Sequence, residues 1–167
     1  QQAGVGRRVA APGPPDGALV DTVGTYPNGL IGNMGEDPTG PWMGPHFESY
    51  TRVAAAGSRI AIGHGSVSEL SVYRVADTAR LERLLRWTTV DRTVSAEDIA
   101  AERARLREQY PELDPARFRR MVAPLIREDR PAAKVFPAFS GIIAGRDGRL
   151  WVRDARELLD HASRDRR

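Results

Sequence analysis

The chain contains no cysteine and only one lysine, Lys134, among its 167 residues. The absence of cysteine excludes disulfide bonds and thiolate metal sites, and it leaves the redox compartment open. No apolar run approaches the roughly 18–20 residues of a membrane-spanning helix, so we expect no membrane span. The first residue is Gln1 and no hydrophobic leader follows it, which predicts a processed product or a piece of a longer protein.

The charge balance and the composition predict a folded chain without a nucleic-acid partner. The formal net charge is +3, which is too small to indicate nucleic-acid binding by itself. The densest basic patch, Arg117, Arg119 and Arg120, is narrow and lacks a platform of aromatic side chains. Hydrophobic residues make up 41% of the chain and charged residues 28%, which is typical of one globular domain.

Proline and glycine divide the N-terminal part into loop and strand. Residues 1–17 end in the run PGPPDG and are predicted to be an irregular lead. Residues 18–26 then indicate a strand. Residues 27–46 are rich in glycine and proline and predict a long irregular loop.

Residues 48–87 predict a four-stranded antiparallel sheet. Short apolar segments at 49–55, 59–63, 70–75 and 81–87 are separated by turn residues such as Gly57-Ser58 and Asp77. Connections this short pair consecutive strands in sequential order. Such a sheet is the size of one β-propeller blade, and Trp87 at its end is expected to be structural.

The next segment predicts a helical insertion at about 95–123, which extends to 128 with its linker. Ser95 with acidic residues behind it is typical of a helix N-cap, and this helix should run to about Tyr110. Asp114-Pro115 predicts a second start, and Pro124 predicts that this helix ends near Val122.

A hairpin is predicted at residues 139–153. Asp147-Gly148 should supply the positive-φ turn between two apolar runs. Because Trp151 alternates with Leu150 and Val152, both faces of its strand should be covered, and Trp151 should be largely buried. Replacing it with alanine would then cost about 3–5 kcal/mol. Residues 155–167 form a charged C-terminal tail with a short helix expected at 156–162.

These segments, taken in order, resemble a known class of proteins. The stretches are 21–24 (DTVG), 58–63 (SRIAIG), 69–73 (ELSVY), 84–87 (LLRW), 94–99 (VSAEDI), 137–139 (PAF) and 147–152 (DGRLWV). In this order they resemble bacterial six-bladed β-propeller proteins of the NHL-like kind over residues 18–154. The resemblance implies a mainly β fold and a helical excursion between two late blades.

The chain departs from that class in length. A blade takes roughly 40 residues, so we expect about one complete blade and parts of two others, in other words an incomplete propeller. Its partners would be the remaining blades, another protein, or a second copy joined through open sheet edges. Members of the class are often exported, which implies a periplasmic or extracellular setting if the full-length protein carries a signal peptide.

Three residues are candidates for ligand binding. Trp42 and His46 lie close together in the glycine-rich loop, and His64 lies between glycines in a predicted turn. Nothing near His64 has metal-ligand spacing, and Ser66 lacks the Gly-x-Ser-x-Gly context of a nucleophile, so no metal ligand and no catalytic residue is assigned. Packing is the alternative for Trp42 and His46.

Two functions remain open at this point. One is a non-enzymatic propeller segment that acts as an interaction or ligand-binding scaffold, with no cofactor of its own. The other is a fragment of an NHL-like hydrolase or lyase with a metal in the central channel, which the resemblance implies. Propellers host both functions, so the fold does not choose between them. A helical regulatory protein built on residues 95–128 is a third, less favoured class.

Overall fold

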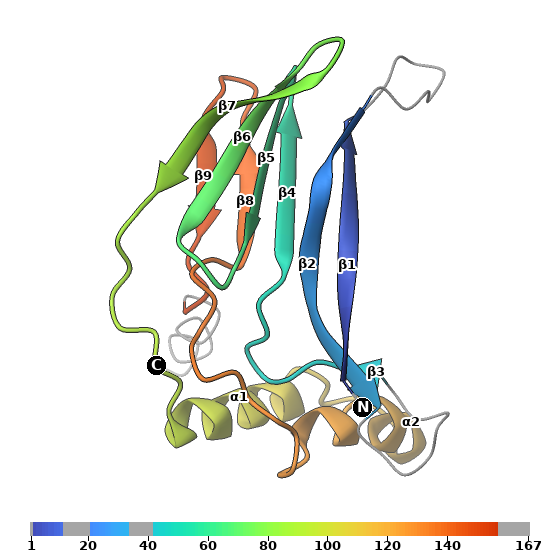
Figure 1. The fold of residues 1–167 in the computed structure, drawn as a ribbon. Coiled ribbons are helices and arrows are strands. Elements are labelled where there is room, and N and C mark those ends of the chain that lie inside the picture. The colour runs from blue at the N-terminus through green and yellow to red at the C-terminus, as the bar shows by residue number, and fades with distance from the viewer. Residues whose placement is uncertain (1, 12–20, 34–41, 157–167) are drawn as a thin grey trace.

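The computed structural model describes residues 2–11, 21–33 and 42–156 (Figure 1). The described chain is mainly β, with three antiparallel sheets and a small helical layer beneath their lower ends. The strands are β1 Gln2–Ala11, β2 Asp21–Asn33, β3 Trp42–Met43, β4 Thr51–Ala56, β5 Arg59–His64, β6 Glu69–Val75, β7 Ala79–Arg86, β8 Gly141–Ala144 and β9 Leu150–Arg153. The helices are α1 Ala96–Glu108, α2 Pro115–Met121 and the 3-10 turn η1 Ala123–Ile126.

The predicted four-stranded sheet is confirmed as β4-β5-β6-β7, with every neighbouring pair antiparallel. Gly57 closes the first turn with a φ of 56°, a value that favours glycine. On β5, Ile60 and Ile62 face one side while Ala61 and Gly63 face the other, and all four residues are buried. The sheet is therefore covered on both faces at its centre.

Strand β2 covers the first face. Val23 and Tyr26 pack against the cluster of Ile60 and Ile62, and the hydroxyl of Tyr26 lies 2.9 Å from that of Tyr73. The side chain of Asp21 also accepts a hydrogen bond of 2.9 Å from the backbone N–H of Ala79. These contacts hold the long β1–β2 ribbon against the four-stranded sheet.

The N-terminal predictions were wrong in two places. Residues 2–11 of the predicted irregular lead form β1, and β2 continues past Pro27 to Asn33 instead of ending at Tyr26. The register between β1 and β2 shifts between Gly4 and Gly6, and Gly6 is the residue that pairs with Pro27. This irregularity accommodates the proline, which has no N–H to donate to the neighbouring strand. The rest of the predicted lead, residues 12–17, lies outside the described residues.

The hairpin of β8 and β9 covers the second face. Ile142 packs with a buried cluster of Leu70, Ala138 and Phe139, and Trp87 lies against the same cluster, its ring centroid 5.8 Å from that of Phe139. Trp87 thus packs against the buried cluster on the second face.

The prediction that Trp151 is buried was wrong, since 60% of the residue is exposed. Trp151 is paired across the hairpin with Ile143, which is 59% exposed. Only the opposite face of the hairpin, with Ile142, meets the four-stranded sheet. Burial of Trp151 requires a further layer on the outer face, and no described residue supplies one.

The predicted position of the hairpin turn is confirmed, but the conformation of its residues differs from the prediction. Gly148 has a φ of 81°, whereas Asp147 has no positive φ. Asp147 instead accepts a hydrogen bond of 3.1 Å from the backbone N–H of Arg149 through its carboxylate. The backbone N–H of Gly145 donates to the carbonyl of Arg149, so five residues, 145–149, connect the strands.

Both predicted helix starts are confirmed. Ser95 and Asp98 form a reciprocal capping box at the start of α1, and Asp114 caps α2 ahead of Pro115. Helix α2 ends at Met121, its C-cap Val122 is fully buried, and the chain continues as η1. Of the predicted tail 155–167, only Ala155 and Arg156 are among the described residues. No helix of the described residues is long and apolar enough to cross a membrane.

Candidate functional site

A cavity of about 250 Å³ lies where the helical layer meets the lower end of the sheets. We call it the helix-side cavity. Its walls come from three parts of the chain: the segment that leads into β4, helix α1, and residues 130–140 that lead into β8. The residues that matter for its chemistry are Phe47, Tyr50, Arg52, Glu102, Arg105, Arg130 and Phe136.

Aromatic side chains form one wall of the helix-side cavity. The rings of Phe47 and Phe136 lie 4.6 Å apart at a tilt of 55°, a favourable aromatic contact. Phe47 has a φ of 58°, which is unusual for a residue with a side chain and costs of order 1–3 kcal/mol. The strained backbone places its ring in the cavity wall.

Charged side chains also line the cavity. Arg105 donates two hydrogen bonds of 2.6 and 2.8 Å to the carboxylate of Glu102, so the two charges are paired with each other. Arg130 donates to three backbone carbonyls, those of Gly44, Leu125 and Pro45, and forms no ion pair with any described residue. Burial lowers the pKa of Arg130 because it disfavours the charged form.

Tyr50 and Arg52 complete the cavity on the strand side. The guanidinium of Arg52 lies 5.6 Å from the centre of the Tyr50 ring, a cation–π contact. Burial, followed by the charge of Glu48, raises the pKa of Tyr50, so the hydroxyl stays protonated at neutral pH. The side chains that line the helix-side cavity thus include three arginines and two glutamates, Glu48 and Glu102.

His46, one of the predicted ligand-binding residues, lies beside this cavity but is only 2% exposed. Its backbone N–H donates to the carbonyl of Pro131, and its own carbonyl accepts from Ala133, which ties the segment before β4 to residues 131–133. Burial, then the charges of Arg130 and Arg103, lowers the pKa of His46 to about 4. A neutral, enclosed imidazole is what a packing role for His46 would require. Nε2 of this ring has no hydrogen-bond partner among the described atoms.

His64 lies at the end of β5, and its side-chain contacts are local. Its Nδ1 is 2.7 Å from Oγ of Ser66, and the backbone N–H of Ser66 also points to Nδ1 at 3.4 Å. Two contacts between residues two positions apart hold the β5–β6 turn together. Among the described residues, no three histidine, aspartate or glutamate side chains gather into a metal-binding group.

Trp42, the third predicted ligand-binding residue, lies on β3, where its backbone pairs with Asn33 of β2. Its neighbour Met43 is buried. The structure therefore places the backbone of Trp42 in a sheet and His46 in the helix-side region, while His64 belongs to a turn of the central sheet.

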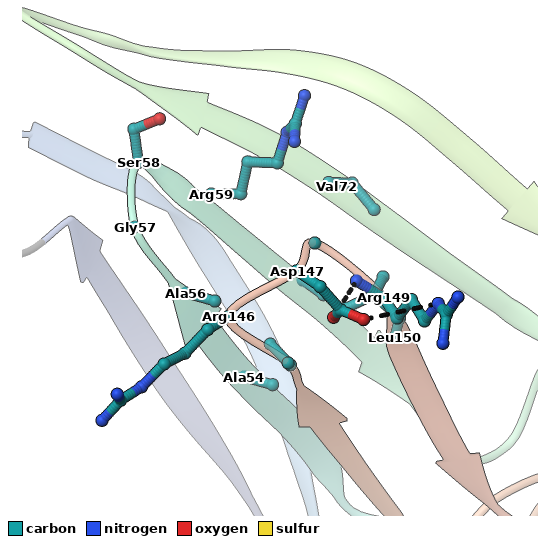
Figure 2. Close-up of a pocket in the computed structure, with 14 residues that line it drawn as sticks. Ala54, Ala56, Gly57, Ser58, Arg59, Val72, Arg146, Asp147, Arg149 and Leu150 are labelled. Carbon is teal, nitrogen blue, oxygen red and sulfur yellow. Dashed lines mark hydrogen bonds and ion pairs between the residues drawn. The ribbon is translucent and has the colours of Figure 1, made fainter.

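A second cavity of about 320 Å³ lies at the opposite end of the sheets, between the β4–β5 turn and the hairpin turn (Figure 2). Its floor consists of small side chains, Ala54, Ala56 and Ala61, and Asp147 binds Arg149 at its rim. In Figure 2 the side chains of Arg59, Arg146 and Arg149 point in different directions. These cations do not converge on one ligand atom.

The helix-side cavity was not predicted from the sequence. Phe47, Glu102, Arg105 and Arg130 carry no recognisable motif. No local pattern marks these residues, because the fold brings them together from positions more than 80 residues apart.

Comparison with protein-family models, curated proteins and solved structures found no match to this chain.

Proposed function

We propose that this chain supplies blade-like sheets of a β-propeller and acts as a non-enzymatic interaction or ligand-binding scaffold. The observation that carries the proposal is the packing of antiparallel sheets in successive layers. The β1–β2 ribbon lies on one face of the β4–β7 sheet, and the β8–β9 hairpin lies on the other. Face-to-face packing of antiparallel sheets is the arrangement by which propeller blades follow one another.

The outer face of the hairpin supports the presence of a further layer. Ile143 and Trp151 stand opposite each other on this face, and about three-fifths of each residue is exposed. An exposed pair of large apolar residues on a sheet is typical of an interaction surface. We call this pair the hairpin outer face.

The occupant that fits this surface is another antiparallel sheet of the same kind. Continuity supports this choice, because the inner face of the same hairpin already packs against such a sheet through Ile142. When no further blade is present, a second copy of the chain offers a matching surface. The proposal therefore predicts self-association of the isolated chain through the hairpin outer face.

Sedimentation velocity of the purified chain over a range of concentrations tests this proposal. The wild type should associate, and the double substitution Ile143→Thr with Trp151→Ser should weaken association by about tenfold or more, because it removes the apolar contact. Val90→Thr is the matched control. Val90 is 72% exposed and lies outside the strands, so its replacement should leave association unchanged.

A wild-type chain that stays monomeric and unfolds cooperatively at every concentration would overturn the proposal. Association that persists in the double variant would also overturn it, because the contact would then lie elsewhere. Circular dichroism of each variant shows whether the fold is retained, which separates a lost contact from a lost structure.

A further inference from the structure

We propose that the helix-side cavity binds a small carboxylate that carries a flat apolar group. This inference rests on the ligand-binding part of the proposed function, and it assigns a ligand class to one site. The cavity is smaller than the roughly 300–1,000 Å³ of sites for drug-sized molecules, so its ligand is correspondingly small.

The charge of the cavity favours an anion, because its lining carries three arginines against two glutamates, Glu48 and Glu102. Arg105 and Glu102 neutralise each other through their paired hydrogen bonds. Arg130 remains as a half-buried guanidinium whose partners are backbone carbonyls, which carry no net charge. Arg103 adds further positive charge, since it is close enough to lower the pKa of Arg130, and it donates a hydrogen bond to the carbonyl of Glu128. A bound carboxylate would supply the counter-charge that this partly desolvated cluster lacks.

The geometry of Arg130 leaves it able to bind such a ligand. A guanidinium has five N–H donors in a planar fork, and three hydrogen bonds to carbonyls are formed here. Two donors remain, one on each terminal nitrogen, since Nη1 and Nη2 each donate once. Because these carbonyls fix the guanidinium before a ligand arrives, little side-chain entropy is lost on binding.

The aromatic wall selects the remainder of the ligand. Phe47, Phe136 and Tyr50 all line the cavity, and the Tyr50 hydroxyl is protonated. Flat apolar groups pack well on such rings, and the phenol supplies one polar contact that orients a carboxylate. The lining thus offers both aromatic surface and cationic groups to a ligand.

Isothermal titration calorimetry of the full chain with benzoate tests the inference, with benzamide as the neutral analogue of the same shape. Benzoate should bind in the millimolar range or tighter, and benzamide should bind about tenfold more weakly, because only benzoate carries the charge. Raising the salt concentration should weaken benzoate binding more than benzamide binding.

Two substitutions locate the site. Arg105→Gln leaves Glu102 without its partner and so adds negative charge to the wall, and it should reduce benzoate affinity by about tenfold. Arg107→Gln on the same helix is the matched control, because Arg107 is exposed and does not line the cavity. Arg130→Gln should also abolish binding, but it removes three bonds to the backbone, so Arg105→Gln carries the test if that variant does not fold.

Equal affinity for benzoate and benzamide would overturn the inference, as would equal loss of affinity in the Arg105 and Arg107 variants. Absence of benzoate binding at millimolar concentration would overturn it as well. The double variant of the hairpin outer face should bind benzoate like the wild type, since Ile143 and Trp151 do not line the cavity. This measurement separates failure of the ligand site from failure of the association proposal.

Discussion

The central sheet and the hairpin share the same sequence pattern but differ in burial. On β5, Ile60 and Ile62 are at most 3% exposed, whereas on the hairpin Ile143 and Trp151 are about 60% exposed. Both segments are short apolar strands next to a glycine turn. The difference lies in the number of layers. Among the described residues, β5 has a neighbour on each face, whereas the hairpin has one on its inner face only. Burial of a strand thus depends on what packs against it, and its own hydrophobicity does not decide the outcome.

The sharpest test of this comparison is to truncate one large aromatic residue in each region. Phe139 is 1% exposed and packs with Leu70 and Trp87, so Phe139→Ala should lower the free energy of unfolding by about 3–5 kcal/mol. Trp151→Ala on the hairpin outer face should lower it by less than about 1 kcal/mol in the monomer. Urea titration followed by circular dichroism at low protein concentration measures both values.

Similar losses of unfolding free energy in the two variants would contradict the difference in burial between the central sheet and the hairpin. A large loss at Trp151 would mean that its face is covered in solution, and sedimentation velocity at the same concentration would show whether a second copy covers it.

The second prediction concerns pH and the buried histidine. The pKa of His46 is about 4 in the folded protein, below the ordinary value of 6.5, so between these values the unfolded chain binds a proton that the folded protein does not. The contribution of neutral His46 to the free energy of unfolding is fully present above about pH 6.5 and is lost as the pH falls toward about 4. The whole contribution is at most about 3 kcal/mol. His46→Gln should remove this part of the pH dependence.

Urea titrations of the wild type and His46→Gln at neutral pH and near pH 4 measure the effect. The carboxylates titrate in both proteins, so the difference between the two pH profiles isolates His46. Parallel profiles would show that the imidazole is hydrated and that the segment before β4 packs loosely.

The smallest effect concerns two glycines in strands. A Cβ on Gly63 would clash with Cδ2 of Leu70 and would lie 2.9 Å from Cζ of Phe139. Gly63→Ala should therefore destabilise the protein by about 1–3 kcal/mol through overpacking. Gly141→Ala is the control on β8, where a Cβ would lie 3.9 Å from Cβ of Arg153. Thermal unfolding compares the two variants, and a Gly63→Ala variant as stable as the wild type would mean that Leu70 and Phe139 pack less tightly on β5 than the structure shows.

Local signals were enough to predict much of the fold. Gly57, Ser95 and Asp114 each marked a turn or a helix start through their own backbone chemistry, and the structure confirms all three. The signals failed where distant pairing overrides local preference. Pro27 indicated the end of a strand, yet pairing with β1 carries β2 through it.

The candidate site was much less predictable than the fold. His46 was a candidate because it lies near Trp42 in a glycine-rich segment, whereas Glu102, Arg105 and Arg130 resemble ordinary surface charges in the sequence. Their role depends on the packing of α1 and residues 130–140 against the segment before β4. The predicted burial of Trp151 was wrong for a related reason, because the sequence of a strand does not specify how many sheets surround it.

The way the helix-side cavity is assembled also has a consequence for folding. The β4–β7 sheet consists of neighbours joined by connections of two to four residues, so its chain closures are short and inexpensive in entropy. The cavity instead joins Tyr50 to Arg130 and Phe136, so its closure requires contacts between residues far apart along the chain. We therefore expect the sheet to form early and the cavity to close last. A carboxylate bound there would slow unfolding while leaving the rate of folding nearly unchanged.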